Sequence, residues 1–348
     1  LVGSEMCIRD RALIMTLLNR GFFILLSYFF IDENINGKEN RLHTFSHPCM
    51  GTIFKVSVYS EKSRNKVEHI VEESFKIANE MDDRFSDYSA ESEVSKFNEQ
   101  GSGIPFKISS DLLELLSISE GLYHKTNASF EPAAGALTQL WRLSRKTKRL
   151  PDQKTLSQAI KASNFASLIV DKKNKTLTKK DHLTRLDFGG IAKGFTADKM
   201  LNYLQEHDLK SCSISAGGDV IVGDPPPGRL YWIIRINPFG DSKSETMRVK
   251  LSNAAVSTSG NVEQFIQIGG KKYSHIINPK NGLGLTTNHA AVVISNKGSM
   301  SDALATSISI LGKSGLKILN HFPNTEAAII DLNDNKVIKS PNFNNISK

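Results

Sequence analysis

The chain contains few cysteines, and their spacing forms no pattern. Its 348 residues include only Cys7, Cys49 and Cys212, without a C-x-x-C motif. This argues against a disulfide framework and against a cysteine-ligated zinc site. A hydrophobic content of 39% and a charged content of 23% are typical of a globular protein with a sizeable core.

The chain has an apolar run near its start, but this run is too short to span a bilayer. Gly21 to Phe30 matches the apolar core of a signal peptide, and Arg20 precedes it. We expect residues 1–14 to be a non-native, adaptor-like extension and residues 15–42 to be a signal peptide or anchor plus linker. No A-x-A site precedes Ile31, so cleavage and permanent anchoring both remain open, and we expect an exported protein.

Acidic residues are scarce in one segment. The chain carries a net charge of +8, yet residues 142–180 alone hold 12 Lys or Arg against Asp152 and Asp171, a balance of 12 − 2 = +10. Nucleic-acid binding would require interleaved aromatics, and only Phe165 lies there. The segment therefore indicates a solvated basic lobe or attraction to an acidic membrane surface or partner.

A glycine-rich stretch, residues 186–198 (LDFGGIAKGFTAD), leads into a helical pattern. Gly189 and Gly190 allow the backbone to approach a ligand closely, and Lys193 beside a helix start suits an anion. A plain strand–helix connection, with glycines for tight packing, explains these residues equally well. Other motifs must decide between the two.

Periodicity predicts helices early in the chain and strands late. Helices are expected at 62–85, from Ser92 onward, at 111–125 (capped by Asp111 and Glu114), at 154–162 and at 301–311. Strands are expected at 43–59, 168–179 (a hairpin), 211–215, 220–222, 230–236, 247–256, 265–268, 273–277, 290–295, 327–332 and 336–338. Residues 257–260 read as a loop of small hydroxyl residues.

Asp302 and Thr306 lie four residues apart on a predicted helix and so share one face. A carboxylate and a hydroxyl are hard oxygen ligands suited to Mg²⁺, together with backbone carbonyls and phosphate oxygens. The alternative is an acid that favours the helix dipole and a threonine bonded to the backbone. The metal interpretation gains weight only with a phosphate site elsewhere.

Eight short motifs occur in a fixed order between about residues 43 and 312. They are M-G-T (50–52), F-S-x-Y-x-x-x-S (85–92), F-E-P with L-W (130–132, 140–141), D-x-G-G-I-A-K-G (187–194), A-G-G-D (216–219), T-S-G (258–260), H-I-I-N-P (275–279) and D-A-L-A-T (302–306). Together they make the chain resemble the ApbE family of FAD:protein FMN transferases.

The resemblance implies a fold, an activity and a location. Family members are similar in being exported, periplasmic or membrane-anchored, Mg²⁺-dependent enzymes. They split FAD, pass FMN to a threonine hydroxyl of an acceptor flavoprotein and release AMP. The acceptor is typically a membrane redox pump subunit or an exported reductase. The implied fold class is α+β, in a single large ApbE-like, T-fold-related domain over residues 43–340, with mixed or antiparallel sheets and flanking helices.

The resemblance also implies site residues. The catalytic set is His275, Lys193 and Asp302. The chemistry of the transfer requires a base that removes the proton of the acceptor hydroxyl, and our hypothesis assigns that role to His275. The metal set is Gly190, Asp302 and Thr306. The FAD-binding set is Met50, Tyr88, Ser129, Phe130, Glu131, Asp187, Lys193 and His275.

Three positions depart from the family pattern. The family usually has aspartate where Glu131 and Asn278 stand, and threonine where Ala133 stands.

Two other functions remain open at this point. One is an FAD pyrophosphatase, in which water replaces the threonine and free FMN and AMP result. The other is an exported FAD-binding protein without turnover.

Overall fold

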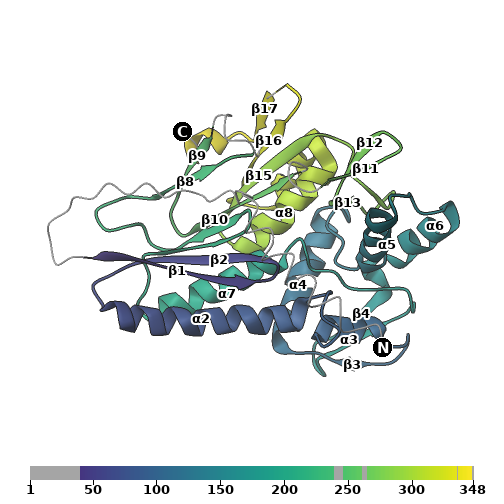
Figure 1. Cartoon of the computed structure of the whole chain (residues 1–348), viewed down its shortest axis with the longest axis horizontal. Coiled ribbons are helices and arrows are strands. Elements are labelled where there is room, and N and C mark those ends of the chain that lie inside the picture. The colour runs from purple at the N-terminus through teal and green to yellow at the C-terminus, as the bar shows by residue number, and fades with distance from the viewer. Residues whose placement is uncertain (1–39, 239–245, 261–264, 335, 347–348) are drawn as a thin grey trace.

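The computed structural model describes residues 40–238, 246–260, 265–334 and 336–346 (Figure 1). Its centre is an eight-stranded sheet of order β1-β2-β6-β7-β10-β15-β16-β17, in which every neighbouring pair is antiparallel. These strands are β1 (Arg41–Cys49), β2 (Thr52–Ser60), β6 (Cys212–Ala216), β7 (Asp219–Val222), β10 (Ala254–Gly260), β15 (His289–Ser295), β16 (Glu326–Asp331) and β17 (Lys336–Lys339).

Four small sheets complete the strand content of the described residues. They comprise β3 (Phe106–Lys107), β5 (Thr176–Lys179) and β4 (Leu168–Asp171); β8 (Trp232–Ile236) and β9 (Met247–Leu251); β11 (Phe265–Ile268) and β12 (Lys271–Ser274); and β13 (Ile277–Asn278) and β14 (Leu283–Gly284).

The helices are α2 (Arg64–Phe85), α3 (Glu93–Glu99), α4 (Ser110–Lys125), α5 (Gly135–Thr147), α6 (Gln153–Ala162), α7 (Ala192–Glu206), α8 (Gly298–Leu311) and α9 (Phe343–Ile346), with 3₁₀ segments η1 (Phe165–Ser167) and η2 (Gly312–His321). The α+β expectation is confirmed. Among the described residues, no helix combines the length and hydropathy that crossing a membrane requires.

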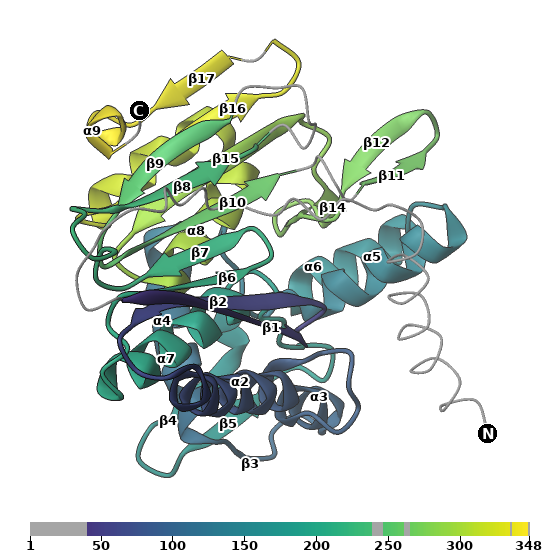
Figure 2. The same cartoon turned by 60° about the vertical axis from the view of Figure 1, so that its left-hand side comes forward.

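Both faces of the large sheet are covered, as strand alternation requires. On β15, Ala291 and Val293 join the core under α4 and α8, whereas Val292 and Ile294 join the core under β8, β9 and α9. Figure 2 shows α2 and α7 at one end of the helical layer and the β8–β9 hairpin on the opposite face of the sheet. The sheet therefore holds α7 and α8 side by side on one face.

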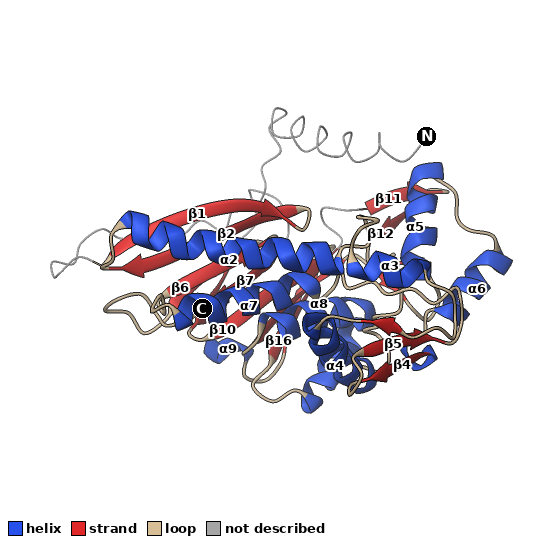
Figure 3. Ribbon diagram, turned by 90° about the horizontal axis from the view of Figure 1, so that it is seen from below, coloured by secondary structure: helices blue, strands red, loops and turns tan. Residues whose placement is uncertain are grey.

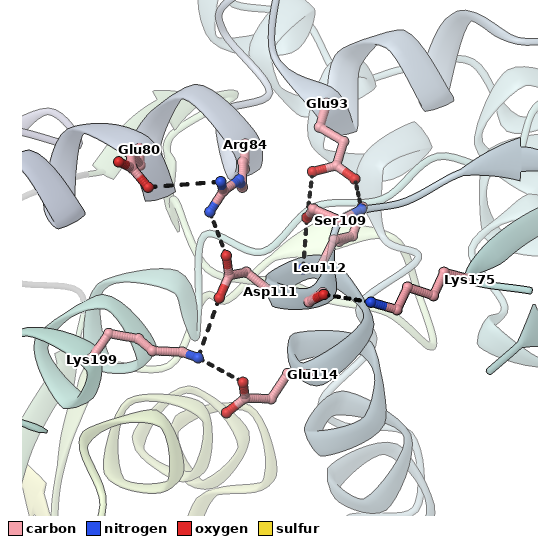
Figure 4. Close-up of polar contacts among 10 residues, drawn as sticks. Glu80, Arg84, Glu93, Ser109, Asp111, Leu112, Glu114, Lys175 and Lys199 are labelled. Atoms are coloured by element: carbon pink, nitrogen blue, oxygen red, sulfur yellow. Dashed lines mark hydrogen bonds and ion pairs between the residues drawn. The ribbon is translucent and has the colours of Figure 1, made fainter. Parts of the chain in front are cut away.

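Polar contacts tie α4 to its neighbouring helices (Figure 4). Asp111 forms ion pairs with Arg84 of α2 and, at 3.2 Å, with Lys199 of α7, and Lys199 also lies 2.6 Å from Glu114. The expected cap by Asp111 and Glu114 is therefore wrong. Ser109 caps α4 instead, and its Oγ accepts from the Leu112 amide at 3.1 Å.

Three expected strand boundaries are also wrong. The segment 43–59 is a hairpin, because Met50 (φ 49°) and Gly51 (φ 69°) form a two-residue turn between β1 and β2. The segment 247–256 divides at Asn253 (φ 47°) into β9 and β10, which belong to different sheets. The segment 273–277 likewise divides between β12 and β13.

The expected loop 257–260 is the second half of β10, paired with β15. Its small residues allow α8 to pack closely. Ser257 Oγ lies 2.8 Å from Ser301 Oγ, and Ser309 Oγ donates to the Ser259 carbonyl at 2.9 Å. A run of small residues suggests a loop in the sequence, but here it allows close packing between a strand and a helix.

Helix α5 was not expected from the sequence. Its first residue, Gly135, crosses the chain before the glycine-rich stretch so closely that a Cβ there would lie 2.7 Å from Arg185 Cβ. Figure 3 shows α5 and α6 extending beyond the large sheet, beside β11 and β12. Residues 1–39, which include the expected extension and most of the expected signal segment, lie outside the described residues, and β1 begins at Arg41.

Candidate functional site

Helices α7 and α8 cross at two glycines. A Cβ on Gly194 would lie 2.2 Å from the Gly298 carbonyl oxygen, and one on Gly298 would lie 2.7 Å from the Gly194 carbonyl oxygen. Asp198 fixes the crossing, because its carboxylate accepts from the amides of Gly298 (2.7 Å) and Ser299 (2.9 Å) at the start of α8. The crossing sets the register between Lys193 and Asp302.

Lys193 lies between two carboxylates. Its Nζ is 3.2 Å from Asp302 Oδ2 and 3.3 Å from Asp219 Oδ2. Asp302 also accepts from the Gly194 amide at 3.2 Å. The carboxylates are nearly inaccessible, with side chains 8% and 3% exposed, whereas the lysine retains 26% exposure. The group thus presents its cation, not its anions, to solvent.

The charges of this group depend on one another. Burial alone would lower the pKa of Lys193, but the negative charges of Asp219 and Asp302 outweigh it and raise that pKa. Burial, and then the charge of Asp302, raise the pKa of Asp219 to about 6, against the opposing effect of Lys193. The lysine is therefore charged at neutral pH and offsets part of the negative charge of its two partners.

Hard oxygen atoms gather beside this group. A Cβ on Gly190 would lie 3.2 Å from Thr306 Oγ1, so the expected backbone ligand and the expected hydroxyl ligand are neighbours. Asp302 precedes Thr306 by one turn of α8. Among the described residues, no cluster of three or more His, Cys, Asp or Glu side chains could hold a metal. Carboxylate, hydroxyl and carbonyl oxygens nevertheless form the donor set that Mg²⁺ accepts when phosphate completes its coordination.

The A-G-G-D turn and the M-G-T motif meet at the same lysine. A Cβ on Gly217 would lie 3.4 Å from Thr52 Oγ1 and 3.9 Å from Lys193 Cε. The Gly218 carbonyl accepts from the Thr258 amide at 3.0 Å, which joins the T-S-G motif to this turn. The turn at Gly217 and Gly218 therefore joins the start of β2 and strand β10 beside the Lys193 side chain.

Met50 occupies a left-handed position that a β-hairpin turn requires. Its amide donates to Asp82 Oδ2 at 3.2 Å, and its sulfur lies 3.5 Å from Thr196 Oγ1 on α7. The side chain is thus held against the helix that carries Lys193.

Tyr88 projects from a loop closed by serines. The Ser86 Oγ accepts from the Tyr88 amide at 3.3 Å, and Ser92 donates to the Ser86 carbonyl. The Tyr88 residue is 79% exposed, and the Arg142 guanidinium of α5 lies 3.9 Å from its ring centroid. The spacing of F-S-x-Y-x-x-x-S therefore builds a loop that presents an aromatic ring.

Asp187 links this loop region to the glycine pair. Its Oδ1 accepts from the Gly189 amide at 2.7 Å and its Oδ2 from Thr138 Oγ1 at 2.5 Å. Burial, followed by the charge of Asp187, raises the pKa of Asp87 to about 6, although Arg142 opposes the shift. Asp187 thus shapes the loop before α7 and acts on the Tyr88 loop through its charge.

The segment 129–131 is buried. Ser129 Oγ donates to the Thr126 carbonyl at 3.0 Å, and Phe130, 5% exposed, packs in the core. The Phe130 side chain is therefore part of the core, and its amide donates to Thr126 Oγ1 at 3.1 Å. Glu131, 8% exposed, accepts from the Ala133 amide at 2.8 Å, and burial raises its pKa to about 7.

Glu131 also lines a cavity of about 360 Å³. Other lining residues are Tyr123, Lys161, Ser163, Asn164 and Lys280. Ser163 Oγ is buried and has no hydrogen-bond partner among the residues that the structure describes. A backbone bond from Asp187 to the Pro132 carbonyl, 2.9 Å, joins this cavity wall to the glycine-rich stretch.

His275 lies on the surface, in the bend between β12 and β13. Trp141 supports this bend, because its Nε1 donates to the Ser274 carbonyl at 3.1 Å. Asn278 closes the following turn, with its Oδ1 accepting from the Lys280 amide at 3.0 Å. An aspartate could accept the same bond, so the turn is compatible with either residue.

The structure brings Lys193, Asp302, Thr306 and Gly190 together. Met50 contacts Thr196, one turn of α7 after Lys193, and Asp187 lies in the loop before α7. Tyr88, Glu131 and His275 lie on three other segments, and no contact among the described residues joins Tyr88 or Glu131 directly to this group. Asp219 lies in one of the sequence motifs, but no role was predicted for it, and none was predicted for Arg142. The glycine pair before Asp219 was the signal that could have identified Asp219.

Comparison with known proteins decides the family. The family model described as the ApbE family matches residues 50–330, which is most of the chain. The chain belongs to the ApbE family. Among curated relatives of this ApbE chain, the FAD:protein FMN transferase of Treponema pallidum is 29% identical over 298 residues, covering 81% of this chain and 82% of that protein.

Further ApbE proteins agree in sequence and in fold. The FAD:protein FMN transferase of Klebsiella pneumoniae is 24% identical, covering 87% of this chain and 93% of that protein. The ApbE protein of Thermotoga maritima superposes with a TM-score of 0.80 at 23% identity, covering 88% of this chain and 100% of that chain. The flavin transferase ApbE of Vibrio cholerae gives 0.77 at 22% identity, with 88% and 99% covered. The expected ApbE-like fold is thus confirmed.

Proposed function

We propose that this chain is a transferase that moves the FMN part of FAD to a threonine hydroxyl of an acceptor flavoprotein, with Mg²⁺, and releases AMP. One observation carries the proposal. Lys193 lies between Asp219 and Asp302, beside the adjacent Gly190 and Thr306, in a chain whose relatives are named FAD:protein FMN transferases.

The oxygen donors fit a magnesium ion. Asp302, Thr306 and the Gly190 carbonyl would hold it, and the phosphates of FAD would complete its coordination. When bound, Mg²⁺ neutralises charge that develops on the pyrophosphate oxygens. Lys193, charged and partly exposed, would contact the same phosphates, while Asp219 and Asp302 hold its Nζ in place.

The transfer exchanges one phosphorus–oxygen bond for another. The threonine oxygen of the acceptor bonds to the FMN phosphorus, the pyrophosphate bond to AMP breaks, and AMP leaves with the electron pair. The hydroxyl proton moves to a base. His275, exposed on a bend anchored by Trp141, is the proposed base.

The remaining contacts would orient FAD. Met50 lies against α7, Tyr88 offers an exposed ring, Asp187 orders the loop at the glycine pair, and the Ser129–Glu131 segment forms one wall of a cavity. Phe130 would contribute through its backbone. These residues come from separate motifs, so FAD would be held by several segments of the chain at once.

The acceptor and the location follow from the same proposal. A flavin transferase requires an acceptor flavoprotein, and we propose a membrane redox pump subunit or an exported reductase. The protein would then act outside the cytoplasm, in the periplasm or anchored at the outer face of the inner membrane. Cell fractionation of chains with and without residues 15–42 tests this, because a cytoplasmic full-length chain would contradict it.

Asp302→Ala tests the metal and His275→Ala tests the base. The first variant should lose Mg²⁺-dependent transfer, and the second should bind FAD normally but transfer slowly. Unchanged Mg²⁺ dependence of Asp302→Ala would refute the metal set, and a full transfer rate in His275→Ala would refute the base.

A further inference from the structure

We propose that Arg142 is a positioning residue that holds Tyr88 as a stacking platform for a planar ring of FAD. The inference rests on the proposed function, since it assumes that FAD is the ligand. It concerns a residue that lies outside the motifs described above.

The geometry around Tyr88 is one-sided. The Arg142 guanidinium lies 3.9 Å from the ring centroid, yet the tyrosine residue is 79% exposed. A guanidinium at this distance stacks on one face of the ring. The opposite face is therefore the one available to a flat aromatic group, which would stack there.

Arg142 is itself held in place. Its Nη2 lies 2.6 Å from Asp87 Oδ2, and the two side chains are 30% and 15% exposed. Asp87 directly precedes Tyr88, and the Tyr88 amide is bound by Ser86. The arginine thus spans from α5 to the loop that carries the tyrosine, and it fixes the plane of a ring that would otherwise rotate freely.

The position of Arg142 on α5 links the platform to the rest of the site. One residue earlier, Trp141 anchors the bend that carries His275, and four residues earlier Thr138 binds Asp187. One helix therefore supports the proposed base, the glycine-rich loop and the tyrosine ring.

The test is a mutant cycle read by ligand binding. Arg142→Ala should raise the Kd for FAD about tenfold and reduce the quenching of bound flavin fluorescence. Arg142→Lys keeps the charge but not the flat guanidinium, so it should bind nearly as weakly as the alanine variant. Arg145→Ala, an exposed cation one turn further along α5, is the control and should bind like the wild type.

The Tyr88→Ala background shows whether Arg142 acts through the ring. In that background the additional Arg142→Ala change should have no effect on FAD binding. An equal loss in both backgrounds, or unchanged binding by Arg142→Ala alone, would overturn the proposal. A thermal melt of each variant separates this loss from misfolding. The proposal requires that the Arg142→Ala chain is folded and nevertheless binds FAD more weakly than the wild type.

Separate titrations with FMN and AMP show which ring is stacked. If Arg142→Ala weakens the binding of FMN alone, the stacked ring is the isoalloxazine; if it weakens the binding of AMP alone, the stacked ring is the adenine. Unchanged binding of both ligands overturns the proposed platform. A wild-type chain that binds no FAD would overturn both this inference and the proposed function. Wild-type binding that Arg142→Ala leaves intact would overturn this inference only.

Discussion

A carboxylate that is only 8% exposed is costly to ionise, although the hydrogen bond that it accepts from the Ala133 amide partly offsets this cost. Glu131 is such a group, and burial raises its pKa from 4.5 to about 7. The folded chain therefore binds this proton more tightly than the unfolded chain. The stability it contributes is full below about pH 4.5 and is lost as the pH rises through about 7.

Glu131→Gln should remove this dependence, because glutamine stays neutral and its carbonyl can still accept from Ala133. At about pH 8 the variant should be more stable than the wild type by about 1–3 kcal/mol, measured by urea unfolding. Glu91→Gln, on an 88% exposed side chain, is the control and should not change the pH profile. A Glu131→Gln profile that parallels the wild type would contradict a buried, protonated Glu131.

Lys193→Met leaves Asp219 and Asp302 without their shared cation. Because both carboxylates are buried, the change should cost about 3 kcal/mol of unfolding free energy in the absence of Mg²⁺. Lys199→Met, which removes a more exposed ion pair from the same helix, should cost less than about 1 kcal/mol. Equal costs for the two variants would show that the buried arrangement has no special role.

At the scale of elements, the site depends on the crossing of α7 and α8. Gly194→Ala places a methyl group against the Gly298 carbonyl, so the helices must separate. We expect a loss of about 1–3 kcal/mol, with weaker FAD binding because Lys193 and Asp302 move apart. Gly121→Ala in α4, where nothing lies within 4 Å, should instead stabilise the chain by about 0.5–1 kcal/mol. A Gly194→Ala variant as stable as Gly121→Ala would contradict this packing.

Sequence reasoning succeeded for elements with strong periodicity and failed where packing decides. Helices α2, α6 and α8 were predicted to within three residues at each end, because their apolar positions repeat clearly. Helix α5 was missed, since its start is dictated by contact with Arg185. The small residues of β10 were predicted to form a loop, but they belong to a strand on which α8 packs closely.

The same limit applies to the site. The order of eight motifs identified the family, and the spacing of Asp302 and Thr306 predicted a shared helix face, which the structure has. No pattern in the sequence could show that Asp219 pairs with Lys193 or that Arg142 lies on Tyr88. Arg142 begins a basic segment that reads as solvated, and only the fold reveals its partner.

At the scale of the whole molecule, the basic segment 142–180 covers the last part of α5, all of α6 and the β4–β5 hairpin at one end of the structure. We expect it to draw the protein to anionic lipid vesicles at low salt and to release it at high salt, because exposed charges are screened. Co-sedimentation with anionic and neutral vesicles measures this. Binding that ignores salt or lipid charge would contradict an electrostatic surface.

The central claim, transfer of FMN at the Lys193–Asp302 centre, is tested most directly by mass spectrometry of an acceptor. Purified protein, FAD, Mg²⁺ and a flavoprotein carrying a target threonine should yield an acceptor heavier by one FMN phosphoester, with AMP released in equal amount. Asp302→Ala should give neither product. Rapid AMP release without an acceptor, together with an unmodified acceptor, would contradict transfer and indicate hydrolysis of FAD.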